Sequence, residues 1–164
     1  MENPSIEKKP TPIMTAVIVL VLLAAAGLRV KDAFLLRRVI WARMSLHDAS
    51  FAVEVADTAA KREKGLGGRS GIAGDHGMYF PFPEARAWVF WMKGMRFPID
   101  IVWIREGKVI DITSDVPVDP GLPLKTYSPV DPADAVLELQ AGTARRIGLQ
   151  RGDAAVLAVS PDGS

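Results

Sequence analysis

From about Arg43 onward, the sequence consists of short apolar runs separated by turn-forming residues, and this pattern restricts the fold more than any other feature of the chain. Within residues 50–56, apolar side chains alternate with other side chains at the period of a half-buried β-strand. Similar runs predict further strands at residues 43–46, 78–82, 88–93, 98–104, 108–113, 135–140 and 154–159. A hairpin turn is predicted at Arg105-Glu106-Gly107, between two of these strands. Strands this short and this numerous favour a mostly antiparallel, barrel-like β-sheet.

Two short helices are expected among these strands. Asp57 or Thr58 is a candidate N-cap for a helix over residues 59–64, which ends at the glycine that follows. A second helix is expected at residues 143–149. Residues 116–132 contain five prolines, which exclude a helix or a central strand there. The predicted fold class is therefore α+β, a compact and mostly antiparallel sheet with two short helices.

Ahead of this domain, residues 13–28 form 16 consecutive residues without a charged side chain. With the uncharged residues on either side, this run reaches the lower edge of the roughly 17–25 residues that cross a membrane as a helix. A cleaved signal peptide is the main alternative, because small residues at 24–26 resemble a cleavage site, and a buried helix is a third. Arg29 and Lys31 follow the run directly and favour an uncleaved, single-pass membrane anchor.

The predicted organisation of the chain follows from these segments. It comprises an N-terminal tail (1–12), the transmembrane anchor or signal peptide (13–28), a basic stalk (29–42), the globular domain (43–159) and a short tail (160–164). Cations are more numerous on the C-terminal side of the apolar run, which by itself favours a cytoplasmic domain.

Composition excludes several classes of site. The chain has no cysteine, which rules out disulfides, thiolate metal sites and a cysteine nucleophile, and its two histidines are too few for the usual catalytic metal sites. With 20 basic and 19 acidic residues, the formal net charge of +1 disfavours a nucleic-acid partner. The glycine-rich loop at residues 64–74 lacks the Lys-Ser/Thr pair of a phosphate-binding loop. The sequence therefore predicts no cofactor and no metal.

Residues 87–104 are the most informative stretch. A β-hairpin over this stretch would pair Trp88 with Trp103 and Trp91 with Asp100. The face that carries Trp88 and Trp103 would then belong to the core, and both rings are expected to be mostly buried.

The opposite face of this hairpin would bring together Trp91, Lys93 and Asp100. An aromatic ring beside two opposite charges could stack on an apolar ligand surface and hydrogen-bond to its polar groups. The same three residues also fit a cross-strand ion pair over a packed tryptophan, which is a common feature of sheets. Both interpretations remain open from the sequence.

A series of short blocks lies in a fixed order along residues 49–156. The blocks are VEVADT (53–58), Arg62 with Gly65-Leu66, Gly77-Met78, Phe82, FWMK (90–93), PIDI (98–101), Tyr127-Ser128-Pro129, VLEL (136–139) with Ala141-Gly142, and Gly148 followed by Arg151-Gly152-Asp153. In identity and order they closely resemble the family called domain of unknown function 192. The resemblance implies a compact α+β domain with no established activity. Members of that family are often exported or membrane-anchored, which implies an extracytoplasmic domain and opposes the cation count.

Two functional classes remain, and the sequence favours the first. The first is a binding module at the cell envelope that engages a small polar ligand, a glycan or an envelope protein. Its candidate ligand-binding residues are Trp91, Lys93, Asp100, Arg62, Arg69 and Tyr127. The second is a small cofactor-independent hydrolase or lyase, with Asp100 or Glu54 as base and Lys93 or Arg69 stabilising charge.

Overall fold

The computed structural model describes residues 39–119 and 121–159. The predicted tail (1–12), the predicted anchor (13–28) and most of the predicted stalk lie outside the described residues, so these predictions stay as they are. Among the residues that are described, no helix is long and apolar enough to cross a membrane.

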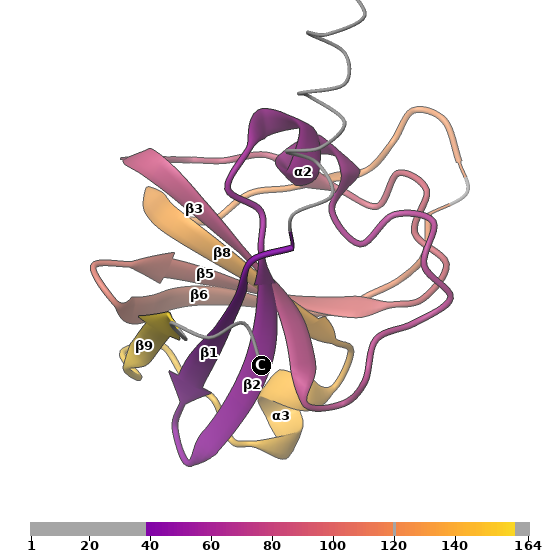
Figure 1. Ribbon diagram of the computed structural model, residues 1–164. Helices are drawn as coiled ribbons and strands as arrows, with labels where there is room; N and C mark the ends of the chain where they lie inside the picture. The colour runs from indigo at the N-terminus through magenta and orange to yellow at the C-terminus, as the bar shows by residue number, and fades with distance from the viewer. Residues whose placement is uncertain (1–38, 120, 160–164) are drawn as a thin grey trace, which may run out of the picture. The chain divides into compact units, whose positions relative to one another are not determined.

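The described residues form nine strands and two short helices in an α+β arrangement (Figure 1). In chain order these are β1 (Trp41–Leu46), β2 (Ala49–Val55), α2 (Ala59–Lys64), β3 (His76–Arg86), β4 (Phe90–Trp91), β5 (Ile99–Arg105), β6 (Lys108–Val116), β7 (Thr126–Tyr127), β8 (Ala133–Gln140), α3 (Thr143–Arg146) and β9 (Ala155–Val159). Seven strands form one sheet in the order β6-β5-β8-β3-β2-β1-β9, and β4 pairs with β7 in a separate two-stranded sheet. The paired strands are antiparallel except β2 and β3, which run parallel.

The large sheet curls into a half-barrel whose two edges meet at one end. Lys108, at the start of β6, forms an isolated antiparallel bridge with Ala154, just before β9. The Val109 amide donates to the Asp153 carbonyl at 2.9 Å, and the Gly152 amide donates to the Val109 carbonyl at 2.8 Å. These bonds use backbone groups that an open edge would leave unpaired.

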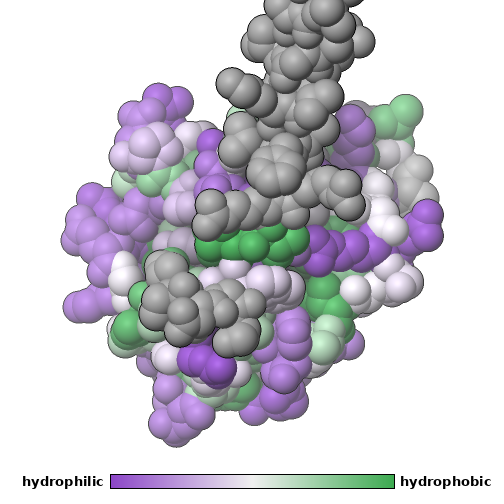
Figure 2. All heavy atoms as spheres, in the orientation of Figure 1, coloured by the Kyte–Doolittle hydropathy of each residue, from purple (hydrophilic) through white to green (hydrophobic). Residues whose placement is uncertain are grey.

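Each face of this sheet carries its own apolar core, because successive strand residues point to opposite faces. On β5, Val102 and Ile104 belong to one cluster, which spans the interior of the half-barrel and which we call the inner core. Ile101 and Trp103 belong to the other cluster, which we call the outer core. Segments outside the large sheet cover the outer core, including residues 92–97. In Figure 2, the visible face is mostly hydrophilic outside the grey atoms, and hydrophobic residues form only small patches.

Local sequence signals are confirmed where they depend on neighbouring residues. Helix α2 covers the predicted residues, and Thr58 Oγ1 accepts a hydrogen bond from the Lys61 amide at 3.2 Å as its N-cap. The turn between β5 and β6 places Glu106 and Gly107 at φ of 51° and 71°, as a tight hairpin requires. Helix α3 is shorter than predicted, since it ends at Arg146.

The predicted hairpin over residues 87–104 is wrong. Both edges of β5 are occupied by other strands, β6 on one side and β8 on the other. Because β8 pairs with β5 from Ile99 to Ile104, no edge remains for residues 88–93. That segment forms only the two-residue β4, which pairs with β7 from the proline-rich stretch, so Trp91 lies opposite Thr126 and not opposite Asp100.

The two tryptophans expected to pair occupy different environments. Trp103 is fully buried, and its indole nitrogen donates to Thr113 Oγ1 at 3.0 Å. Trp88 is only half-buried and stacks on Phe82 with ring centroids 3.9 Å apart. Phe90 supplies the aromatic contact to Trp103, edge to face at 5.4 Å. The core assignment therefore holds for Trp103, and the predicted cross-strand pair does not form.

Candidate functional site

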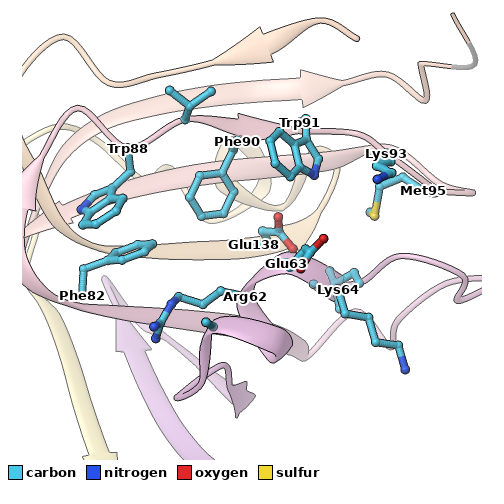
Figure 3. A pocket seen from close by; sticks show the side chains of 14 residues that line it. Arg62, Glu63, Lys64, Phe82, Trp88, Phe90, Trp91, Lys93, Met95 and Glu138 are labelled. Carbon is cyan, nitrogen blue, oxygen red and sulfur yellow. The ribbon is translucent and has the colours of Figure 1, made fainter. Parts of the chain in front are cut away.

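A cleft of about 270 Å³ lies over the outer core, between α2 and the segment from the end of β3 to the chain after β4 (Figure 3). Its lining residues are Ala59, Arg62, Glu63, Lys64, Gly65, Leu66, Phe82, Trp88, Val89, Phe90, Trp91, Lys93, Met95 and Glu138. The volume is close to the lower end of the range of small-molecule sites, about 300–1,000 Å³. Four aromatic rings, three cations and two carboxyl groups line this one space.

The turn after α2 keeps the cleft open. Gly65 ends the helix at φ 49° and ψ −139°, a conformation that side chains rarely adopt. A Cβ at this position would lie 3.8 Å from Glu138 Oε2 and 3.6 Å from the Phe80 ring. Because glycine has no Cβ, space remains beside the Glu138 carboxyl group.

Two stacked aromatic rings with a guanidinium group on each outer side form one end of the cleft. Phe82 and Trp88 lie parallel, with an interplanar angle of 16°. The Arg62 guanidinium lies 5.6 Å from the Phe82 centroid, and that of Arg86 lies 5.5 Å from the Trp88 centroid. Arg62 also donates to the carbonyl of Pro81, which fixes its side chain against the end of β3. The guanidinium groups occupy the ring faces that the stack would otherwise leave free.

The short strand β4 sets the side wall through the alternation of strand side chains. Phe90 points inward and makes edge-to-face contacts with Phe80 at 5.2 Å and with Trp103. Trp91 points outward and keeps 43% of its surface exposed. Because β4 pairs with β7, the backbone that carries Phe90 and the exposed Trp91 is fixed by a partner strand.

Glu138 lies in the middle of the cleft, between the aromatic wall and α2 (Figure 3). It comes from the central strand β8 and is 5% exposed. Its register neighbours are apolar, Met78 on β3 and Ile101 on β5.

Among the described residues, Oε2 of Glu138 has no hydrogen-bond partner. Burial raises the pKa of Glu138 to about 8, and the positive charge of Arg69 offsets only part of that rise. Glu138 is therefore mostly a neutral carboxylic acid at pH 7, with a hydrogen to donate.

Arg69 has a partner of its own. Its Nη2 lies 2.5 Å from Glu54 Oε2, and Glu54 is buried in β2. Glu54 and Glu138 both pair with Met78 of β3, so the two acids lie on the same face of the sheet, two strands apart. The ion pair fastens the glycine-rich loop to β2, and Arg69 does not line the cleft.

Asp100, the central residue of the predicted site, lies elsewhere. It is fully buried on the face of β5 opposite to Ile101 and Trp103. Its Oδ1 accepts hydrogen bonds from the amides of Asp115 at 2.8 Å and Gly142 at 3.1 Å, and Oδ2 accepts one from Ala144 at 2.8 Å. These bonds join β5 to the end of β6 and to the first turn of α3. The structure therefore does not place Asp100 on a ligand surface with Trp91 and Lys93, and that prediction is corrected.

Tyr127 lies next to the cleft but does not line it. It pairs with Phe90 across the two-stranded sheet, and Lys125 Nζ lies 5.2 Å from its ring centroid. Its hydroxyl group is buried and has no hydrogen-bond partner within the described residues. Tyr127 therefore supports β4 from behind.

The structure thus brings together three of the six predicted site residues, Arg62, Trp91 and Lys93. Glu138 was not among the predicted residues, although the sequence carries one signal for it. In the run 135–139, Glu138 is the one charged residue, and it lies in phase with Val136 of the outer core. An acid on a buried face of a central strand is expensive unless it is paired, and this marks the position as unusual.

Comparison with known protein families shows the family to which this chain belongs. The sequence pattern of domain of unknown function 192, described as an uncharacterized ACR, matches residues 42–157, which include the whole cleft. The chain belongs to this family. No curated protein matches it.

Two solved structures are similar to this family member. A protein from Sinorhizobium meliloti, described as a candidate transcription regulator, is 33% identical with a TM-score of 0.66, and the match covers 73% of this chain and 95% of that chain. A protein of unknown function from Novosphingobium aromaticivorans is 27% identical with a TM-score of 0.65, and the match covers 71% of this chain and 84% of that chain. The half-barrel is therefore shared with both proteins, and neither description assigns a ligand.

Proposed function

We propose that this domain is a binding module that holds a small organic molecule in the cleft between α2 and β4. The observation that carries the proposal is Glu138, a buried carboxyl group at the bottom of an open cleft, one of whose oxygens has no hydrogen-bond partner in the described part of the chain. A buried polar group left without a hydrogen bond costs about 1–3 kcal/mol. A group with that cost and a strongly perturbed pKa is typical of a functional site. A ligand that hydrogen-bonds to Glu138 would recover the cost.

Binding is better supported than the hydrolase or lyase alternative. That alternative relies on Asp100 as base, and the Asp100 carboxylate is fully used by three backbone amides away from the cleft. The other candidate base, Glu54, is held by Arg69. The described residues that line the cleft include no serine, threonine, cysteine or histidine, which are the usual nucleophiles and proton carriers of small hydrolases.

The relative described as a candidate transcription regulator does not change this proposal. DNA binding depends on clustered cations that neutralise phosphates. The cations of this chain are nearly balanced by acids, with a formal net charge of +1.

A ligand screen tests the binding function. The full-length protein is heated with a library of organic acids, amines, sugars and nucleosides, and its melting temperature is recorded. A ligand present at 100 times its dissociation constant stabilises the native state by about 2.7 kcal/mol. We expect at least one compound to raise the melting temperature, and Glu138→Leu, which removes the hydrogen-bonding group, and Trp91→Ala to abolish that rise.

Leu122→Ala is the matched control for this screen, because Leu122 is apolar, 90% exposed and outside the cleft. This variant should respond to the same compound as the unchanged protein does. The proposal fails if no compound in the library stabilises the protein, or if the variants at Glu138 and Trp91 respond as strongly as the control.

We also propose that residues 13–28 anchor the domain in a membrane and that the domain faces the extracytoplasmic side. Support for the anchor comes from the length of the uncharged run and from the cations that follow it directly. The extracytoplasmic side is supported by the family, whose members are often exported or membrane-anchored, and is opposed by the cation count. We expect the protein to stay in the membrane fraction after an alkaline carbonate wash. Release of a soluble form that begins near Gly27 would support a cleaved signal peptide instead.

A further inference from the structure

The charges around the cleft point to the class of its ligand. Arg62, Lys64 and Lys93 line it as cations, and Glu63 is the one lining acid that is exposed. Within the described residues, Lys64 and Lys93 make no ion pair. Positive charge therefore exceeds negative charge around the opening, which favours a ligand that carries negative charge.

The aromatic residues do not provide a cage for an organic cation. Such a cage requires free ring faces. The outer faces of the Phe82 and Trp88 stack are already covered by the chain's own guanidinium groups. Phe90 is engaged edge to face with other rings, which leaves the exposed ring of Trp91 to contact the apolar part of a ligand.

Glu138 supplies the hydrogen-bonding group at the bottom of the cleft. On β3 and β5 it faces only apolar side chains, Met78 and Ile101. The positive charge of Arg69, on the glycine-rich loop, lowers the pKa of Glu138 only in part, and Arg69 forms an ion pair with Glu54. Nothing among these neighbours takes a proton from Glu138, so it meets a ligand as a hydrogen-bond donor. A carboxylic acid donates its strongest hydrogen bonds to anionic oxygens.

Building on the proposed function, we infer that the cleft binds a small organic acid as its carboxylate anion. A carboxylate oxygen of the ligand accepts a hydrogen bond from the Glu138 carboxyl group. Lys64 and Lys93 offset the negative charge, and the apolar body of the ligand lies against Trp91.

Anion binding in this cleft should depend on pH in a way that binding by cations alone would not. The charged groups around Glu138 are Arg62, Glu63 and Lys64 on α2, Lys93 after β4, and the pair of Arg69 and Glu54. When Glu138 ionises, near pH 8, it loses its hydrogen and repels the ligand. Affinity for the anion should therefore fall by about tenfold between pH 7 and pH 9.

Three compounds of the same size and different charge test the inference on the full-length protein. Phenylacetate is the anion, 2-phenylacetamide the neutral control and phenethylamine the cation, each titrated by calorimetry at pH 7 and pH 9. We expect phenylacetate to bind at least about tenfold more tightly than the amide at pH 7, and phenethylamine to bind more weakly than both. Glu138→Gln should remove the pH dependence because an amide cannot ionise, Lys93→Met should weaken phenylacetate binding, and Leu122→Ala should change neither.

The inference is overturned if the amine binds best, if none of the three compounds binds, or if Glu138→Gln retains the pH dependence. These failures are distinct from failure of the proposed function. A library compound of another class whose binding depends on Glu138 and Trp91 would preserve the binding function and replace the ligand class.

Discussion

Replacing Asp100 with asparagine is expected to lower the free energy of unfolding by about 3–5 kcal/mol, although the two side chains are almost the same shape. Both carboxylate oxygens of Asp100 accept hydrogen bonds from backbone amides. An asparagine has one oxygen, so in either orientation its NH₂ group would face an amide N–H. The change loses bonds to a charged acceptor and leaves a buried donor unpaired.

Urea unfolding at pH 7 measures this difference. Lys93→Met is the matched control, because Lys93 is exposed and makes no ion pair within the described residues, and it should change the free energy of unfolding by less than about 1 kcal/mol. If Asp100→Asn is as mild as the control, the carboxylate does not hold α3 on the sheet.

The misplacement of Asp100 shows what strand periodicity can and cannot predict. On β5, the alternation correctly assigned Ile101 and Trp103 to a core. It then treated the other face as solvent-exposed, whereas Val102 and Ile104 on that face belong to the inner core. A central strand that is buried on both faces has a nearly continuous apolar sequence. Residues 99–104 have such a sequence, interrupted only by Asp100. The acid within that run was the sign of a buried structural role.

Strand partners were the second source of error, because they depend on residues far apart in the sequence. Helix α2 and the turn at residues 105–107 follow from adjacent residues, and both were predicted. The hairpin over residues 87–104 was the nearest local pairing for β5. The strand that displaces it, β8, begins at Ala133, beyond the proline-rich stretch. No feature of residues 87–104 alone could reveal that competitor.

In the candidate site, too, the residues that depend on local sequence were predicted and the one that depends on distant residues was missed. Trp91 and Lys93 were predicted because they alternate with the apolar residues Phe90 and Met92, and this local pattern does not require knowing the partner strand. Glu138 was missed because its significance depends on distant residues. Met78 and Ile101 make its surroundings apolar, and the missing side chain of Gly65 leaves it uncovered.

The stability of the protein is expected to fall between pH 5 and pH 8 because of Glu138. Its pKa is raised from 4.5 to about 8 in the folded protein, so across this range the native state holds a proton that the unfolded state releases. When the native state binds more protons, the free energy of unfolding decreases as pH rises. The contribution of Glu138 is therefore fully present below pH 4.5 and is lost as the pH rises through about 8. A shift of this size corresponds to about 3–6 kcal/mol.

Urea unfolding at pH 5, 6.5 and 8 measures this loss, and Glu138→Gln should remove it because the amide does not titrate. Glu63→Gln is the matched control, since Glu63 lines the same cleft but is exposed, and it should keep the pH dependence of the unchanged protein. Parallel pH profiles for Glu138→Gln and the unchanged protein would mean that Glu138 is already ionised at pH 5. In that case the cleft would present a carboxylate and not a hydrogen-bond donor, and a bound anion would be repelled. The expected steep profile instead implies that Glu138 keeps its proton up to about pH 8. A bound anion should then stabilise the protein most below that pH, where its affinity is highest.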